Sequence, residues 1–234
     1  IFVGKKDLKY KIIISGNSIS KKNLGPLLQD HNKVLIISDN GVPSDITNKV
    51  KSISKNFSKV FSVILTKGEQ AKSIQNFQKI LNFLADNNFD RTDIIIAVGG
   101  GVVGDISGYV ASSYLRGIQF VQIPTTLLAQ VDSSVGGKTA INISAGKNLV
   151  GAFYNPKSVL IDTSVLESLP EREYKAGLAE VVKYGLIKNK YLFSLLKNNP
   201  QKVMLMNKNI IEDVIFESIK TKAEIVSKDE KENG

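Results

Sequence analysis

Short runs of β-branched and apolar residues alternate along the first 160 positions with segments whose apolar residues recur every three or four positions. The short runs predict strands and the periodic segments predict amphipathic helices. The continuous apolar run at 93–98 is typical of a central parallel strand covered on both faces. The expected strands are 10–15, 33–38, 59–65, 93–98, 119–123 and 158–161, and the expected helices are 42–54, 73–85 and 103–114. This alternation predicts an α/β fold with an open, mostly parallel sheet.

The pattern changes twice after this region. Residues 132–151 are rich in Gly, Ser, Lys and Asn, which predicts a long irregular segment of the kind that often carries function. Beyond about residue 162 only helical patterns remain, at 163–168, 171–188, 191–198 and 202–229. We therefore predict an α/β domain over 1–162 and an all-α domain over 163–234.

The last predicted helix carries an apolar stripe, and Lys222 falls within it. The stripe consists of Ile211, Ile215, Ile219 and Val226. Because a helical domain of about 70 residues is small for an independent core, we expect the all-α domain to be incomplete and apolar sequence to follow it.

Composition excludes several kinds of site. Cysteine is absent and His31 is the single histidine, so disulfides, thiolate sites, Cys nucleophiles and metal sites with two histidines cannot be built from this chain alone. His31 lies in a polar segment, which favours a solvated loop residue over a member of a Ser-His-Asp triad.

The net charge is +9, but the lysines are dispersed and no aromatic motif interleaves with them. We therefore expect no nucleic-acid partner, and without a run of 18 apolar residues we expect no membrane span.

A glycine-rich turn follows the predicted strand 93–98. Gly99, Gly101 and Gly104 form the pattern Gly-x-Gly-x-x-Gly at the start of a predicted helix. Such glycines let the backbone approach a pyrophosphate at a helix N-terminus, as in Rossmann-like nucleotide domains. A plain strand-to-helix turn is the alternative. No acidic residue follows about 20 positions later, so Asp39, at the end of an earlier strand, is the candidate partner for a ribose.

Two polar clusters lie near this motif in the sequence. Residues 67–72, Lys-Gly-Glu-Gln-Ala-Lys, separate a predicted strand from a predicted helix, and a simple capping turn is the favoured alternative there. Residues 132–148 contain Asp132, Lys138, Lys147 and Asn148 among glycines. Glycines beside lysines allow ammonium groups and backbone N–H groups to converge on an anion. A surface hairpin is the alternative for this cluster.

A fourth cluster lies in the all-α region. Glu180 and Lys183 are three positions apart on a predicted helix and share one face among apolar neighbours. A surface ion pair is the alternative. Gly177 and Gly185 argue against it, since glycine costs about 1 kcal/mol relative to alanine inside a helix and indicates close packing or ligand approach.

Taken together, the clusters occur in the order found in 3-dehydroquinate synthases, and the chain resembles that family over nearly its whole length. The motifs are Gly-Glu-Gln-x-Lys, Gly-Gly-Gly-Val-Val-Gly-Asp, Tyr-Leu-Arg-Gly, Gln-Ile-Pro-Thr-Thr-Leu-Leu-Ala-Gln-Val-Asp-Ser-Ser-Val-Gly-Gly-Lys-Thr, Gly-Lys-Asn-Leu-Val-Gly-Ala-Phe-Tyr and Gly-Leu-Ala-Glu-Val-Val-Lys-Tyr-Gly. The resemblance implies conversion of 3-deoxy-D-arabino-heptulosonate 7-phosphate to 3-dehydroquinate and phosphate, in the shikimate pathway of aromatic amino acid biosynthesis. It also implies NAD recycled within each turnover, a divalent metal such as zinc or cobalt, a homodimer and a cytoplasmic location.

The resemblance also assigns residues. NAD-binding positions of the family are matched by Asp39, Glu69, Lys72, Gly101, Val102, Val103, Gly104, Asp105, Thr125, Thr126, Lys138 and Lys147. Positions that bind the anionic sugar-phosphate substrate or act in catalysis are matched by Arg116, Asp132, Lys138, Asn148, Glu180, Lys183 and Lys222. The resemblance places Arg116 at the phosphate, as a residue of the same or the neighbouring subunit. Glu180 matches the glutamate metal ligand.

One departure from the family stands out. The resemblance implies two histidine metal ligands, the first in a Gly-His-x-x-x-His segment, and we expect both beyond residue 234. The chain is therefore expected to be a fragment that is itself inactive. Three alternatives stay open: a cyclase making inosose- or valiolone-type products, a distant relative among iron-dependent alcohol or glycerol dehydrogenases, and a non-catalytic truncation that binds NAD or a partner subunit.

Overall fold

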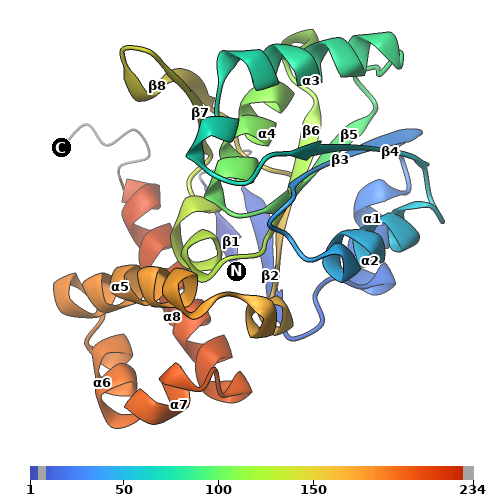
Figure 1. Ribbon diagram of the computed structural model, residues 1–234. Helices are drawn as coiled ribbons and strands as arrows, with labels where there is room; N and C mark the ends of the chain where they lie inside the picture. Colours follow the sequence, from blue (N-terminus) through green and yellow to red (C-terminus); the bar gives the residue numbers. More distant parts are fainter. Residues whose placement is uncertain (5–8, 229–234) are drawn as a thin grey trace.

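The fold is built on a seven-stranded sheet with the strand order β1-β2-β9-β6-β5-β3-β4 (Figure 1). The computed structural model describes residues 1–4 and 9–228. Every neighbouring pair of strands in the sheet is parallel except β1 with β2. The strands are β1 (Phe2–Val3), β2 (Tyr10–Ser15), β3 (Lys33–Asp39), β4 (Lys59–Leu65), β5 (Ile94–Gly99), β6 (Gln119–Pro124) and β9 (Ser158–Asp162). The predicted α/β fold is confirmed.

Helices cover both faces of this sheet, and strand β3 shows why its sequence is apolar throughout. Val34 and Ile36 belong to the core beneath α1 and α2, whereas Leu35 and Ile37 belong to the core beneath α3 and α4. Alternate side chains of a strand point to opposite faces, so both sets must be apolar. The four helices are α1 (Lys21–Leu28), α2 (Ser44–Ser54), α3 (Ile74–Asp86) and α4 (Gly101–Ser113).

Two of these elements have no counterpart among the predicted ones. Strand β1 is only two residues long, too short to show a period. Helix α1 contains Gly25 and Pro26, both of which disfavour a helix interior, yet Leu24 and Leu28 are fully buried. Burial of its apolar face against the sheet therefore outweighs its weak propensity.

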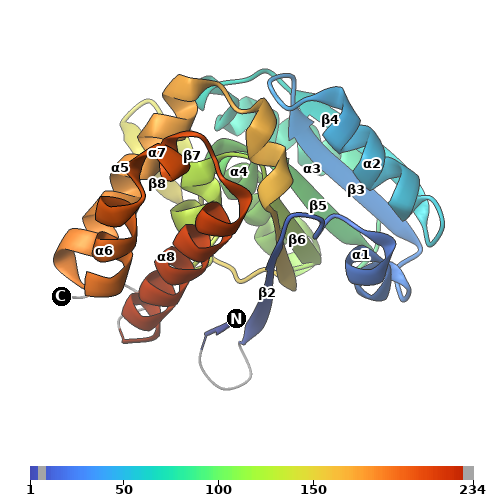
Figure 2. The ribbon, with the colours of Figure 1, turned by 90° about the horizontal axis from the view of Figure 1, so that it is seen from below.

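After β9 the described chain is helical. The elements are η5 (Thr163–Ser168), α5 (Glu171–Ile187), α6 (Lys190–Asn198), α7 (Pro200–Met204) and α8 (Lys208–Lys228). They lie together beside the sheet at the edge where β2 runs (Figure 2). Three residues of the stripe on α8, Ile211, Ile215 and Ile219, are buried in a core shared with β2.

The single helix predicted over 202–229 is wrong. The chain turns between α7 and α8, where Met206 adopts a left-handed backbone with φ of 52°. Asn207 then precedes the first residue of the next helix, and its side chain accepts a hydrogen bond from the backbone N–H of Ile210. A left-handed residue cannot continue a right-handed helix, so two helices replace one.

The long irregular segment predicted over 132–151 is also wrong. Most of it is the antiparallel hairpin of β7 (Lys138–Ile143) and β8 (Gly146–Phe153), which follows a π-helical turn, η4 (Ala129–Ser133). Glycines here permit close packing: a Cβ on Gly151 would lie 2.0 Å from the carbonyl oxygen of Thr139, and one on Gly108 of α4 would lie 2.4 Å from the Thr139 methyl group. The alternative of a hairpin is the one that the structure shows.

His31 is not a solvated loop residue, as its polar sequence neighbours suggested. It is 7% exposed and lies just before β3, at the amino-terminal edge of the sheet. Its Nδ1 donates to the carbonyl oxygen of Thr92, and its Nε2 lies 3.0 Å from Lys157 Nζ. A carbonyl only accepts, so Nδ1 carries the proton and Nε2 accepts from Lys157.

Within the described residues, no helix is long and apolar enough to cross a membrane.

Candidate nucleotide and substrate site

The candidate site lies at the carboxyl-terminal edge of the sheet, where three adjacent strands end. Strands β3, β5 and β6 are neighbours and end at Asp39, Gly99 and Pro124. From β3 the chain continues outward to β4, whereas from β5 it continues in the opposite direction to β6. Such a switch point leaves a crevice at the carboxyl ends of the strands, where ligands bind in open α/β sheets.

A cavity of about 360 Å³ occupies this crevice. Eight of the residues predicted to bind NAD line it together: Asp39, Glu69, Lys72, Gly101, Val102, Asp105, Thr125 and Thr126. The structure adds lining residues from the start of the helical region that sequence reasoning missed, namely Ser168, Leu169, Pro170, Glu173 and Ala176. No local motif marks this second group, since only the approach of α5 to the sheet brings it into the crevice.

The glycine-rich turn enters the cavity at the N-terminus of α4. Gly100 caps this 13-residue helix, and no side chain accepts from its first N–H groups. The glycines are required by close packing, because a Cβ on Gly99 would lie 2.6 Å from Val103 Cγ2 and one on Gly101 would lie 2.8 Å from Ser133 Oγ. Free N–H groups at a helix start are a favourable place for a pyrophosphate.

A buried lysine joins three predicted residues behind this turn. Lys72 is 4% exposed, and its ammonium group lies 2.5 Å from Asp105 Oδ2 and 3.9 Å from Glu69 Oε1. It also donates to the side-chain oxygen of Asn148 on β8. Burial raises the pKa of Asp105 above its usual value despite the opposing charge of Lys72. The simple capping turn considered for residues 67–72 is therefore part of a charged network.

The hairpin is fastened to the same network through Asn142. The side chain of Asn142 donates to Glu69 Oε1 at 2.7 Å and accepts from the Asn148 N–H at 2.9 Å, while its own N–H donates to the carbonyl of Lys72 at 2.7 Å. Asn148 has a left-handed backbone with φ of 57°. Asn142 has no counterpart among the predicted site residues, and these contacts connect it to elements distant in sequence.

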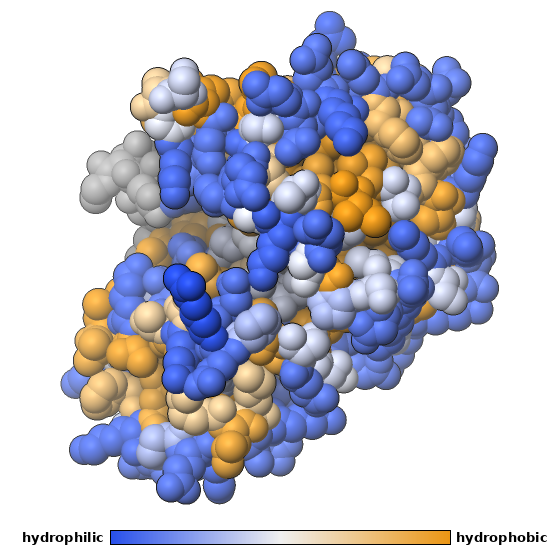
Figure 3. Space-filling model, viewed as in Figure 1, coloured by the Kyte–Doolittle hydropathy of each residue, from blue (hydrophilic) through white to orange (hydrophobic). Residues whose placement is uncertain are grey.

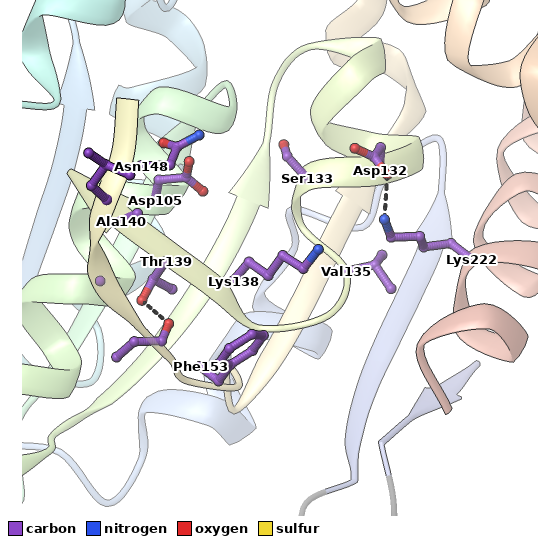
Figure 4. A pocket seen from close by; sticks show the side chains of 13 residues that line it. Asp105, Asp132, Ser133, Val135, Lys138, Thr139, Ala140, Asn148, Phe153 and Lys222 are labelled. Atoms are coloured by element: carbon purple, nitrogen blue, oxygen red, sulfur yellow. Dashed lines mark hydrogen bonds and ion pairs between the residues drawn. The ribbon is translucent and has the colours of Figure 1, made fainter. Parts of the chain in front are cut away.

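A second cavity of about 470 Å³ lies between the hairpin, η4 and α8 (Figure 4). Its polar lining includes Asp132, Lys138, Asn148 and Lys222, all predicted substrate-binding residues. Asp105 and Ser133 line both cavities, so the two share a wall. A molecule in one cavity is therefore within reach of a molecule in the other. Figure 3 shows hydrophilic side chains around the hollow between the α/β and helical parts.

Asp132 is held from two helices of the all-α region. Its Oδ1 accepts from Tyr184 Oη at 2.6 Å and lies 2.8 Å from Lys222 Nζ. Burial alone would raise the pKa of Asp132. The hydrogen bond and positive charge of Lys222, together with the hydrogen bond from Tyr184, instead hold this pKa below its usual value. Burial and the Asp132 carboxylate raise the pKa of Tyr184, and Glu180 adds to this. Tyr184, absent from the predicted site, thus stands between the second cavity and the predicted metal ligand.

Six predicted residues, Glu180 among them, do not line the two cavities. Lys147 lies in a separate open groove beside Glu69 and Asn142. Lys183 is 59% exposed and pairs with Glu180 at 2.9 Å, which is the surface ion pair considered as the alternative. The other three are Arg116, which is exposed at the end of η3 (Tyr114–Arg116), Val103, which is buried in the sheet core, and Gly104, which faces Gln122.

The residues present suit NAD and do not by themselves suit a metal ion. For NAD, the crevice offers uncapped N–H groups, the carboxylate of Asp39 and a buried, partnerless hydroxyl on Ser133. For a metal, Glu180 is 19% exposed, and the described part of the chain contains no group of three or more His, Cys, Asp or Glu able to hold an ion. His31 lies at the opposite edge of the sheet. A catalytic zinc site normally needs three protein ligands.

Two family models match the chain: 3-dehydroquinate synthase N-terminal over residues 62–176 and 3-dehydroquinate synthase C-terminal over residues 177–234. The chain belongs to the 3-dehydroquinate synthase family. It is 44% identical over 240 residues to the 3-dehydroquinate synthase of Prochlorococcus marinus subsp. pastoris, covering 100% of this chain and 66% of the relative. For the Vibrio atlanticus 3-dehydroquinate synthase the identity is 43% over 235 residues, with 100% and 65% covered. The chain thus spans about 65% of the length of these curated relatives.

Solved structures of sugar-phosphate cyclases share this fold. The chain superposes on 2-deoxy-scyllo-inosose synthase complexed with carbaglucose-6-phosphate, NAD⁺ and Co²⁺ with a TM-score of 0.91 and 28% identity, covering 100% of this chain and 64% of that one. For 2-epi-5-epi-valiolone synthase from Streptomyces hygroscopicus with NAD⁺ and Zn²⁺ bound, the TM-score is 0.89 at 25% identity, with 98% and 64% covered. An iron-containing alcohol dehydrogenase from Thermotoga maritima shares the fold at 16% identity and a TM-score of 0.70, with 93% and 67% covered.

Proposed function

We propose that this chain forms the NAD-binding part and one wall of the substrate site of a 3-dehydroquinate synthase. The reaction converts 3-deoxy-D-arabino-heptulosonate 7-phosphate to 3-dehydroquinate and inorganic phosphate. The shared wall of the two cavities, formed by Asp105 and Ser133, carries the proposal, since hydride exchange requires the cofactor and substrate to touch. The higher identity to dehydroquinate synthases than to the inosose and valiolone synthases favours this branch of the fold.

NAD when bound would supply a hydride acceptor that is regenerated in the same turnover, so the net reaction releases only phosphate. We place the adenosine ribose at Asp39, the pyrophosphate at the uncapped start of α4, and the nicotinamide at the wall shared with the second cavity. Lys72 neutralises Asp105 behind this wall, which keeps a second negative charge from facing the phosphates.

The second cavity suits an anionic sugar phosphate. Lys138 extends from the hairpin into the cavity, towards the side on which Lys222 pairs with Asp132 (Figure 4). Two ammonium groups can bind the carboxylate and phosphate of the substrate, while Asp132 and Asn148 offer oxygen acceptors for its hydroxyl groups. The pair of Lys222 with Asp132 also keeps Asp132 ionised and therefore able to accept.

We further propose that Glu180 is one ligand of a divalent zinc or cobalt ion, whose other ligands are not among the residues described. Arg116 is exposed and lines neither cavity of its own chain, which supports a homodimer in which it serves the neighbouring subunit's substrate phosphate. The cytoplasm, where this biosynthetic route runs in bacteria, is the expected location.

The test is phosphate release from the heptulosonate phosphate by this chain joined to the corresponding C-terminal third of the Prochlorococcus relative. We expect turnover with NAD and zinc or cobalt, and loss of turnover with Glu180→Gln. Glu171→Gln is the matched control, because Glu171 lies on the same helix and pairs only with the exposed Lys175. The 234-residue chain alone should bind NAD without turnover. A folded fusion that binds NAD and releases no phosphate would contradict the proposal.

A further inference from the structure

The side-chain oxygen of Ser133 is buried, and it has no hydrogen-bond partner among the described residues. A buried polar group without a partner destabilises a protein and calls for a physical explanation. Within residues 1–4 and 9–228, five other buried side-chain atoms share this condition: Ser18 Oγ, Ser54 Oγ, Ser107 Oγ, Gln130 Oε1 and Ser134 Oγ. Ser133 alone among these six lines the two cavities of the site.

The position of Ser133 identifies what its hydroxyl faces. The π-helical turn η4 places it between the cavities, and Figure 4 shows it between Asp105 on one side and Asp132 on the other. Its Oγ lies 2.8 Å from the point that a Cβ on Gly101 would occupy. The hydroxyl therefore packs against the first residue of α4 and belongs to the cofactor side of the shared wall.

The part of NAD that reaches this wall follows from the chemistry. The cofactor cavity extends from Asp39 to Ser133 and Asp105, and only the latter end borders the substrate cavity. The nicotinamide is the redox end of NAD, so it must lie at the shared wall. There Asp105 is already engaged by Lys72 at 2.5 Å, which leaves the Ser133 hydroxyl as an uncommitted polar group.

We propose that the Ser133 hydroxyl hydrogen-bonds the nicotinamide end of NAD, through its carboxamide, and so fixes the ring against the substrate cavity. This inference rests on the proposed function. A carboxamide has both a donor NH₂ and an acceptor oxygen, either of which a serine hydroxyl can match. Binding of NAD would then give the buried hydroxyl the partner it lacks in the free protein.

The experiment compares Ser133→Ala with Ser134→Ala by calorimetric titration of NAD⁺ and of ADP-ribose, together with melting temperatures without ligand. Ser134 is the matched control, because its Oγ is also buried and partnerless but it lines neither cavity. ADP-ribose has the adenosine, pyrophosphate and second ribose of NAD but no nicotinamide. It therefore reports on the rest of the site.

We expect Ser133→Ala to raise the Kd for NAD⁺ about three- to tenfold, the effect of one hydrogen bond, and to leave the Kd for ADP-ribose unchanged. Ser134→Ala should change neither Kd. Neither variant should lower the melting temperature, since each removes an unsatisfied hydroxyl. An unchanged NAD⁺ affinity in Ser133→Ala, an equal loss for both ligands, or a lower melting temperature only in Ser133→Ala would overturn the inference. Failure of the unsubstituted chain to bind either ligand would instead overturn the proposed function.

Discussion

Lys222 on α8 and Asp132 on η4 form an ion pair at 2.8 Å that joins the helical region to the α/β part of the chain. Both side chains are partly shielded from water, and Tyr184 on α5 donates to the same carboxylate oxygen at 2.6 Å. Two helices thus converge on one carboxylate in the wall of the substrate cavity. The shape of that wall depends on the charge of Asp132.

This dependence predicts a loss of stability in acid. The pKa of Asp132 is lower in the folded chain than its usual 3.8, so the unfolded chain takes up the proton first as pH falls. The stabilisation is complete well above pH 3.8 and is lost as pH falls through the folded value. We expect the difference in unfolding free energy between the unsubstituted chain and Asp132→Asn to shrink as pH is lowered from 7 towards 3, measured by urea unfolding. A difference independent of pH would contradict this.

The pair of Lys72 with Asp105 predicts a large effect of removing one charge. Lys72→Met leaves the Asp105 carboxylate buried without its cation, and we expect a loss of about 3 kcal/mol in unfolding free energy. Lys67→Met is the control, because Lys67 and its partner Glu173 are both exposed and 3.5 Å apart. That change should cost less than about 1 kcal/mol. Equal losses in urea unfolding would show that the burial of Lys72 has no energetic consequence.

Much of the fold could be predicted because its elements have clear periods. Strand β3 is apolar at every position since each face of it is covered, and that pattern is visible without a structure. The hairpin β7–β8 was only an alternative to the predicted irregular segment, because its glycines suggest flexibility. Gly151 on β8 and Gly108 on α4 instead permit contact with Thr139, which depends on the packing of α4.

The candidate site was predicted less completely than the fold. Motifs and resemblance identified residues such as Asp39 and Asp105, and the structure brings eight of the predicted NAD residues to one cavity. Tyr184, by contrast, resembles any buried aromatic residue of an amphipathic helix. Its role depends on Asp132, 52 positions away in sequence. Single-sequence patterns carry little information about pairs at such separations.

The burial of His31 predicts a structural role without a catalytic one. His31→Leu leaves the Thr92 carbonyl without its imidazole donor and removes one of the two acceptors of the Lys157 ammonium, the other being the Leu27 carbonyl, and we expect a loss of about 2 kcal/mol in unfolding free energy. The affinity for NAD should not change, since His31 lies at the far edge of the sheet. Combining it with Lys157→Met should cost less than the sum of the two single changes, because both single changes remove the same hydrogen bond between His31 and Lys157. Additive losses would contradict the pairing.

Gly177 on α5 predicts a steric effect that reaches the site. A Cβ at this position would lie 2.7 Å from the backbone nitrogen of Leu128, which cannot move without shifting η4 and Asp132. Gly177→Ala gains about 1 kcal/mol of helix propensity, yet overpacking should outweigh this and destabilise the chain by about 1–2 kcal/mol net. Gly104→Ala is the control, because its Cβ would meet only the movable end of Gln122 at 3.3 Å. Urea unfolding should therefore show a loss for Gly177→Ala and none for Gly104→Ala, and the opposite order would show that α5 can move away from the turn without cost.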